Sequence, residues 1–305
     1  MEENQAPGPP RVSAVVLSYN TAASLRRCLS ALEASSIREQ MEIIVVDAAS
    51  QDESPRLDAE FPNVAFQRMP RNFGATKALN IGARTALGEQ IFFIAPEVEV
   101  DKDTAVRLAA HLEANAEIAA VCPALFTPDG RPAHELHKLP TPDLLKRAWH
   151  DPEALPDVEP DLSDGPVSVQ FPSRAALMVR KFNLRSINYL DEKYGQFWAD
   201  ADLSYQILKA GKKIFLIPDA RAIVHAAEDL DFSSSARALL DADRATGASR
   251  YASKYFGFMS GLGITIGAAL HSMGQMLAFR DPGFQPSRLI GILSRKKVDG
   301  TQTSL

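Results

Sequence analysis

Long apolar runs alternate with helical patterns over the first third of the chain. Three runs are apolar at nearly every position: "VSAVVLS" from residue 12, "MEIIVV" from residue 41 and "QIFFIA" from residue 90. Between the first two, apolar residues recur at helical spacing from Leu25 to Leu32. A strand that is apolar along its length buries both faces, and strands separated by helices run parallel. The alternation therefore predicts an α/β fold with a Rossmann-like, mainly parallel sheet flanked by helices.

The rest of the chain contains fewer patterns of the same kinds. Residues 74–88 predict a helix that Gly88 stops, and residues 199–213 predict a helix that ends at Gly211. "RAALMVRK" predicts a strand, and "IFLIP" and "RAIVH" predict two further short strands.

Composition and charge narrow the class of protein. Of the 305 residues, 46% are apolar and 23% are charged, which is ordinary for a soluble globular protein. The formal net charge of −5 gives no electrostatic support for a nucleic-acid partner, so we expect none. Two cysteines without metal-ligand spacing, and a start "MEENQAPGPP" that is unlike a signal peptide, indicate a cytoplasmic protein.

We expect three parts along the chain. Residues 1–10 are polar and proline-rich, which predicts disorder, and residues 11–250 form the main domain. Within that domain, residues 127–170 contain eight prolines and no long periodic run, which indicates a long loop or insertion. Residues 251–305 form a C-terminal helical extension.

The extension contains an uncharged segment followed by a basic tail. Residues 255–279 include no Asp, Glu, Lys or Arg, but glycines and polar residues interrupt them. We therefore favour a helix on a membrane surface or against the domain over a spanning helix. Arg288, Arg295, Lys296 and Lys297 follow, and such a tail suits the anionic headgroups at the inner face of a membrane. Packing on the main domain or on a second subunit is the alternative.

Polar side chains gather where three of the predicted strands end. Residues 18–20 follow the first strand, Asp47 ends the second, and Glu97 and Glu99 follow the third. In parallel sheets, ligands bind outside the carboxyl ends of the strands. The sequence therefore predicts a ligand site at this edge.

Several longer motifs occur together and in order. They are "VVLSYN", "EIIVVDAASQDES", "RNFGATKALNIGARTALGEQIFFIAPEVEV", "LMVR", "FWADADLSYQILKAGKKIFLIPDARAIVH" and "RYASKYFG". With these motifs the chain resembles the family 2 glycosyltransferases over residues 11–256, and the resemblance implies a GT-A fold. "APEVEVD" and the tail after His225 are most similar to the bacterial rhamnosyltransferase-like members.

The resemblance assigns residues to the nucleotide of a nucleotide-diphosphate sugar. Asp47 would accept a hydrogen bond from the base. A glycine lets backbone come close to a ligand, and a helix N-terminus favours anions. The other residues implied to line the nucleotide and pyrophosphate pocket are Ser18, Tyr19, Asn20, Asn72, Gly74, Lys77 and Asn80. Simple helix capping is the alternative for these residues.

The resemblance also implies a metal site at the third strand end. Aligned on Pro96, Ala95 and Glu97 occupy the positions of two metal-binding residues, so Glu97 is the candidate ligand for Mg²⁺ or Mn²⁺. His225 matches the histidine that often completes the metal or pyrophosphate site, with a structural role as the alternative. Glu99, two residues further on, would support the site or meet solvent.

The candidate general base lies in "WADADL". The family has a pair of acids here, of which Ala199 replaces the first and Asp200 keeps the second. Asp200 would take the acceptor proton in a single displacement that inverts the anomeric configuration. Asp202 would cap the helix that follows. Trp198 would stack on a sugar face of the acceptor or pack in the core.

Three further positions depart from the family pattern. Ala49 replaces a glycine, which is a mild change if its backbone angles are ordinary. Ala95 weakens the metal site without abolishing it, because diphosphate oxygens and water complete the shell. Arg174 also replaces a glycine, and its guanidinium would bind an anionic acceptor or the donor pyrophosphate, or would block the site.

These residues favour a metal-dependent, inverting glycosyltransferase. It would transfer a sugar from a nucleotide-diphosphate donor to a glycan or lipid-linked acceptor in cell-surface polysaccharide synthesis. The alternative is a catalytically impaired protein of the same fold that binds nucleotide or acts as a scaffold. A nucleotidyltransferase would need a glycine- and arginine-rich loop after the first strand, and "SYNTAAS" is not one.

Overall fold

The structure of the protein is a computed structural model. It describes residues 8–133, 136–148, 155–227, 232–278 and 283–299. Most of the N-terminal segment for which disorder is predicted, residues 1–10, lies outside the described residues.

Nine strands form the central sheet in the described part of the chain. In chain order they are β1 (Val12–Ser18), β2 (Met41–Asp47), β3 (Ala65–Arg68), β4 (Gln90–Ile94), β5 (Val98–Val100), β6 (Ile118–Phe126), β8 (Val167–Val169), β10 (Ala176–Arg180) and β11 (Lys213–Val224). Their order across the sheet is β3-β2-β1-β4-β10-β6-β11-β5, and β8 pairs with β11. A separate pair consists of β7 (Leu136–His137) and β9 (Phe171–Pro172).

The sheet is mixed, with its longest parallel part at the start of the chain. β3, β2, β1 and β4 pair in parallel, and β6 pairs in parallel with β11. β10 runs antiparallel between β4 and β6, and β5 and β8 run antiparallel to β11. The predicted α/β fold with a mainly parallel sheet flanked by helices is confirmed.

Helices cover both faces of the sheet. They are α1 (Ala22–Glu33), α2 (Ala75–Thr85), α3 (Thr104–Ala114), α4 (Pro142–Ala148), α5 (Lys181–Ser186), α6 (Ala199–Lys209), α7 (Ser234–Phe256), α8 (Phe258–Leu277) and α9 (Phe284–Leu293), with short 3-10 helices η1 (Arg38–Gln40) and η2 (Ser54–Ala59). One buried cluster packs α1 and α3 on one face, and a second packs α2, α6 and α7 on the other. In β1, Ala14 and Val16 belong to the first cluster and Val15 to the second, because successive side chains of a strand point to opposite faces.

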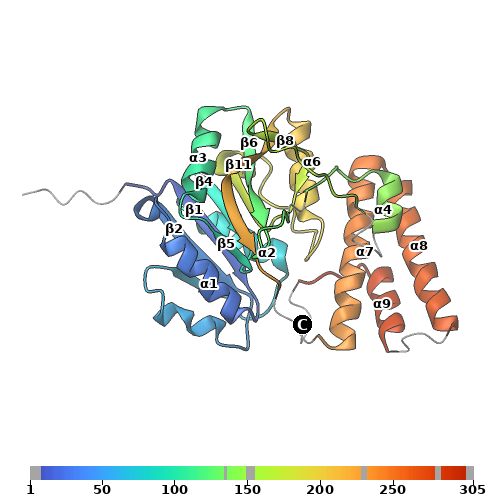
Figure 1. Cartoon of the computed structure of the whole chain (residues 1–305). Helices are drawn as coiled ribbons and strands as arrows, with labels where there is room; N and C mark the ends of the chain where they lie inside the picture. Colours follow the sequence, from blue (N-terminus) through green and yellow to red (C-terminus); the bar gives the residue numbers. More distant parts are fainter. Residues whose placement is uncertain (1–7, 134–135, 149–154, 228–231, 279–282, 300–305) are drawn as a thin grey trace, which may run out of the picture.

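Three helices, two of them long, stand together at one end of the molecule. Figure 1 shows α7, α8 and α9 side by side, with α4 against α7 and α8. α4 comes from the proline-rich segment 127–170, whose described part also contains β7 and β8. The helical region begins at Ser234, and α7 shares a core with the sheet. Among the described residues, no helix is long and apolar enough to cross a membrane.

Two local predictions are wrong. "IFLIP" and "RAIVH" belong to one strand, β11, because its pairing with β6 continues beyond a register shift between Ile217 and Arg221. The helix that the sequence ends at Gly88 is shorter: α2 ends at Thr85, and Ala86 has non-helical backbone angles.

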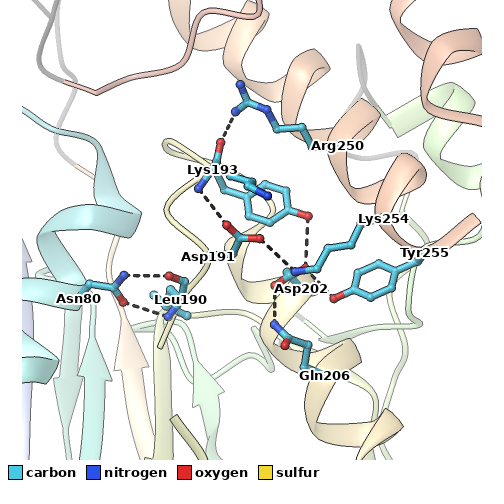
Figure 2. Close-up of polar contacts among 10 residues, drawn as sticks. Asn80, Leu190, Asp191, Lys193, Asp202, Gln206, Arg250, Lys254 and Tyr255 are labelled. Atoms are coloured by element: carbon cyan, nitrogen blue, oxygen red, sulfur yellow. Dashed lines mark hydrogen bonds and ion pairs between the residues drawn. The ribbon is translucent and has the colours of Figure 1, made fainter. Parts of the chain in front are cut away.

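A buried carboxylate joins α6 to α7. Asp202 lies in the first turn of α6 and is 1% exposed (Figure 2). Lys254 and Tyr255, both on α7, donate to its Oδ1 at 2.7 Å each. Tyr194 donates to the same oxygen at 3.3 Å, and Gln206 donates to Oδ2 at 2.7 Å. The sequence suggests that Asp202 caps α6. Its side chain instead accepts from these donors and holds α6 against α7.

Replacing Asp202 with alanine should lower the free energy of unfolding by about 3 kcal/mol, because four donors lose a shared acceptor. Urea unfolding measures the loss. The matched control is Asp219→Ala, an exposed aspartate on β11 that should shift stability by less than about 0.5 kcal/mol. Equal effects of the two substitutions would contradict the role given to Asp202.

Candidate active site

A cavity of about 500 Å³ opens at the carboxyl edge of the sheet. It lies where β1, β2 and β4 end, which is the edge at which the sequence predicts ligand binding. Leu240 of α7 and the nearby Phe232 form part of its wall. Five predicted site residues line it: Tyr19, Asn72, Glu97, Arg174 and Asp200.

The end of β2 holds a buried carboxylate with an unused acceptor atom. Asp47 is 2% exposed, and its Oδ2 accepts a hydrogen bond from the backbone N–H of Ser50 at 3.1 Å. Its Oδ1 is buried and has no hydrogen-bond partner among the described residues. Because such an oxygen is costly to leave unpaired, it is suited to accept from a ligand. The adjacent Ala48 lines the cavity.

Ser18, Tyr19 and Asn20, which were predicted together, have different roles in the turn after β1. The hydroxyls of Ser18 and Thr21 are 3.1 Å apart, and the side-chain oxygen of Asn20 accepts from the backbone N–H of Gln51 at 2.7 Å. Tyr19 lines the cavity, and burial raises the pKa of its hydroxyl. Ser18 and Asn20 therefore hold the turn, whereas Tyr19 faces the cavity.

The backbone at Ala49 is strained. Its φ is +65°, in the left-handed region that costs an L-residue about 1 kcal/mol or more. The glycine of the family pattern adopts this conformation without that cost. The expectation of a mild change at Ala49 requires ordinary backbone angles, which this residue does not have.

The turn before α2 is closed by contacts from distant parts of the chain. The side-chain oxygen of Asn72 accepts from the backbone N–H of Gly74 at 2.8 Å. Gly74 has φ +82°, and a Cβ there would collide with the carbonyl oxygen of Val298. The next N–H, that of Ala75, donates to the side-chain oxygen of Gln196 at 3.2 Å. The C-terminal segment and Gln196 therefore cover the N-terminus of α2.

Lys77 and Asn80, both on α2, are not among the residues that line the cavity. The ammonium of Lys77 lies over the Phe73 ring, 4.2 Å from its centroid. The buried Asn80 amide donates to the Leu190 carbonyl at 2.8 Å and to Glu192 at 3.0 Å, and it accepts from the Leu190 N–H at 3.0 Å (Figure 2). Lys77 thus contacts Phe73, and Asn80 contacts Leu190 and Glu192.

Glu97 lines the cavity, whereas His225 does not. The backbone N–H of His225 donates to the Glu97 carbonyl at 3.0 Å, so the two residues are neighbours. The His225 imidazole is instead paired with Glu99, with 2.8 Å between Nε2 and Oε2. No three His, Cys, Asp or Glu side chains in the described ranges are placed to hold a metal ion.

Arg174 lines the cavity and has a donor that is not satisfied within the protein. Its Nη2 donates to the Gln196 carbonyl at 3.4 Å, and its Nη1 is buried without a hydrogen-bond partner among the described residues. A positive charge thus lies in the same cavity as Glu97 and Asp200. The cavity keeps its volume of about 500 Å³ with this side chain in place, so the guanidinium does not fill it.

Of the two aspartates in the first turn of α6, only Asp200 lines the cavity. Asp200 lines the cavity, and one of its oxygens accepts from the Ala201 N–H at 3.0 Å. Ala199, which replaces the first acid of the family pair, is fully buried, so a carboxylate there would lose its hydration. The acid that this chain keeps is the one that faces the cavity.

Trp198 packs in the core and does not line the cavity. It is 7% exposed, and its indole N–H donates to the Arg244 carbonyl at 2.9 Å. Its ring centroid lies 6.2 Å from that of Tyr251. Of the two roles that the sequence leaves open, core packing is the one that matches this position.

Gln196 and Asp243 are residues of the site that the sequence patterns miss. Gln196 lines the cavity, and its backbone N–H donates to Asp243 of α7 at 2.5 Å. A Cβ at Gly195 would lie 2.6 Å from both carboxylate oxygens, so this approach requires glycine. Burial raises the pKa of Asp243 to about 6. The one available signal was an aspartate on the alanine-rich buried face of a helix.

Several solved structures share this architecture. A complex of GalNAc-T7 with UDP, GalNAc and Mn²⁺ has a TM-score of 0.63 at 15% identity, covering 95% of this chain and 56% of that one. The structure of S. aureus TarS 1–349 has a TM-score of 0.54 at 14% identity, covering 93% of this chain and 92% of that one. The structure of mannosyltransferase PcManGT from Pyrobaculum calidifontis, in complex with GDP-Man and Mn²⁺, has a TM-score of 0.51 at 18% identity. The match covers 96% of this chain and 91% of that one. The fold is therefore of the GT-A type.

The family follows from the sequence. Glycosyl transferase family 2 matches residues 13–188, which is more than half of the chain, so the chain belongs to this family. The predicted family is confirmed. The chain spans about half the length of the GalNAc-T7 structure that it matches. A search of curated proteins gives no significant match.

Replacing Asp243 with asparagine should change how stability depends on pH. The folded pKa of Asp243, about 6, lies above the ordinary value of about 3.9, so its contribution to stability is lost as pH rises through 6. The asparagine keeps an oxygen for the Gln196 N–H and does not titrate. Relative to the wild type, Asp243→Asn should therefore gain about 2 kcal/mol between about pH 4 and pH 7. Parallel stability curves in urea unfolding would contradict the burial of this charge.

Proposed function

We propose that this member of glycosyl transferase family 2 transfers a sugar from a nucleotide diphosphate to an acceptor hydroxyl with inversion. The observation that carries the proposal is that Glu97, Arg174 and Asp200 line one cavity. They come from three separate segments: the end of β4, the turn before β10 and the start of α6. Together they supply a metal ligand, a cation for phosphate and a base.

The nucleotide would bind at the ends of β1 and β2. The unpaired Oδ1 of Asp47 provides an acceptor for an N–H of the base. Asp47 is not among the cavity-lining residues, but its neighbour Ala48 and Tyr19 are. The diphosphate would then extend toward Arg174, whose unpaired Nη1 suits a phosphate oxygen. The pyrophosphate role of Arg174 is favoured over blocking because the cavity remains open beside it.

The residues fit a divalent ion that arrives with the diphosphate. Glu97 offers a hard carboxylate oxygen in the cavity, and no cluster of three protein ligands is found among the described residues. Mg²⁺ binds with one or two carboxylates together with substrate phosphates. When bound, such an ion would neutralise charge on the leaving group. The His225 imidazole is engaged by Glu99, so we place His225 as a support for the Glu97 segment.

The transfer would be a single in-line displacement. Asp200 accepts the proton of the acceptor hydroxyl while the hydroxyl oxygen forms the new bond to the anomeric carbon. The bond from that carbon to the diphosphate oxygen breaks, and the nucleoside diphosphate leaves with the electron pair. Arg174 faces the charge that develops on the departing oxygen. The acceptor would be a glycan or a lipid-linked acceptor, and the rhamnosyltransferase-like subgroup stays a prediction.

Replacing Asp200 with asparagine should lower kcat by about 10²–10⁴-fold, because the acceptor loses its base. The change preserves side-chain size, so donor affinity should stay within about twofold of the wild type. Nucleotide-sugar binding is first screened by calorimetry with Mn²⁺, and transfer is then measured as release of nucleoside diphosphate with glycan and lipid-linked acceptors.

The control for this experiment is Asp219→Asn, an exposed aspartate that is not among the cavity-lining residues and should leave kcat unchanged. A wild type that binds a donor yet turns over no faster than Asp200→Asn would support the catalytically impaired alternative. That result would refute the proposed transfer.

Replacing Glu97 with glutamine should weaken donor binding in Mn²⁺ by about tenfold or more, because the cavity loses its metal carboxylate. In excess chelator, the variant and the wild type should bind the donor equally, since no ion is then present. Calorimetry with Mn²⁺ and with chelator distinguishes a metal ligand from a residue that contacts the donor. An equal loss in chelator would show that Glu97 contacts the donor directly.

A further inference from the structure

The exposed large apolar side chains of the described residues are concentrated on two helices. Eleven such side chains are exposed, and nine of them lie on α8 or α9. The nine are Phe258, Met259, Ile266, Leu270, Met273, Met276, Leu277, Ile290 and Leu293. Scattered apolar residues are normal on a surface, but a concentration of this kind marks an interaction site.

The exposed residues of α8 form one stripe. Met259, Ile266, Leu270, Met273 and Leu277 follow each other at intervals of three, four or seven residues, and each is 48–81% exposed. The opposite face of α8 is buried through residues such as Ile264 and Ala268, where the helix packs on α7 and α9. We call this stripe, together with Ile290 and Leu293 of α9, the α8–α9 outer face.

The exposed charges that directly follow this face are positive. From residue 232 to the end of the described chain, the described residues include eight Lys and Arg against three Asp, a formal charge of +5 in a chain of net charge −5. α8 itself contains no charged residue. Arg295 and Lys296, both exposed, directly follow the α9 end of the outer face. Two of the three acids, Asp241 and Asp243, are occupied within the protein. Five of the eight cations are occupied as well: Arg244 and Arg288 pair with Asp241, Lys254 pairs with Asp191 and Asp202, and Arg250 and Lys297 donate to backbone carbonyls. The charges that remain exposed beside the outer face are therefore those of Arg295 and Lys296.

We propose that the α8–α9 outer face binds the surface of a bilayer that contains anionic lipids. An apolar helix face flanked by cations is the arrangement by which helices lie in the interface plane, with the apolar side chains among acyl chains and the cations at the headgroups. α8 would lie along the surface and not cross it, because its other face is occupied by α7 and α9.

A second copy of the chain fits the same face less well. In a two-fold dimer each patch meets its own copy, so the positively charged helical regions would lie beside each other. An anionic bilayer complements both the apolar stripe and the flanking charge. The proposal does not depend on sugar transfer, because none of the residues of the α8–α9 outer face lines the cavity.

Vesicle sedimentation tests the apolar part of the proposal. The full chain should bind vesicles of phosphatidylcholine and phosphatidylglycerol in about equal amounts, and it should bind pure phosphatidylcholine at least about fivefold more weakly. Ile266→Glu and Leu270→Glu should each lower the partition coefficient by about tenfold or more, because they place a carboxylate in the stripe. The matched control is Phe182→Glu on α5, a 78% exposed apolar residue outside the helical region, which should bind like the wild type.

The charge part is tested by Lys296→Glu. The Lys296 side chain is exposed, and the recorded hydrogen bonds of this residue, to Thr246 and Gly291, use its backbone. Binding to the mixed vesicles should fall by about tenfold, and raising the salt concentration should have a similar effect on the wild type. Thermal unfolding of every variant verifies that the fold is kept.

Two outcomes would overturn the proposal. One is a wild type that does not bind the mixed vesicles, or that binds them as strongly as Leu270→Glu does. The other is a stable dimer in analytical ultracentrifugation that Leu270→Glu converts to a monomer while vesicle binding is absent. That second outcome would assign the α8–α9 outer face to a second copy of the chain.

Discussion

The position of α6 depends on the buried carboxylate of Asp202. Two residues earlier in the same helix turn, Asp200 lines the cavity. Because Lys254 and Tyr255 of α7 converge on Asp202, the orientation of that turn is fixed by residues that do not line the cavity. The same α7 supplies Asp243, which holds the backbone of Gln196. The helical region is thus part of the framework that supports the site: Leu240 of α7 forms part of the cavity wall, and α7 also holds Asp202 and Gln196 from outside the cavity lining.

Most of the fold could be predicted from local patterns, because buried runs and helical periodicity report the burial of each segment. β1, β2 and β4 coincide with the three apolar runs. The order of strands could not be predicted in this way: the antiparallel β10 lies between β4 and β6 through pairing between distant residues. The continuity of β11 was missed for a related reason. Pro218 and Asp219 looked like a break in the sequence, but β11 pairs with β6 on both sides of them.

The candidate site was predicted where a motif places a side chain next to the end or the beginning of an element: Tyr19 and Glu97 follow strands, Arg174 precedes β10, and Asp200 lies in the first turn of α6. Tyr19, Glu97, Arg174 and Asp200 all line the cavity. Residues on helices were less predictable, because helical spacing does not say which distant segment will cover them. Asn80 bonds to a loop more than a hundred residues away. Trp198 and Asp243 illustrate the same limit, since the partner of each comes from a different part of the chain.

The place of β10 in the sheet bears on the synthesis of the chain. β10 hydrogen-bonds to both β4 and β6, yet about fifty residues separate the end of β6 from the start of β10. Until the ribosome has released those residues, the nascent chain contains two strands with open edges, which other chains can pair with. The proline-rich segment fills most of that interval. Its length therefore sets how long the growing polypeptide is exposed to aggregation before the sheet can close.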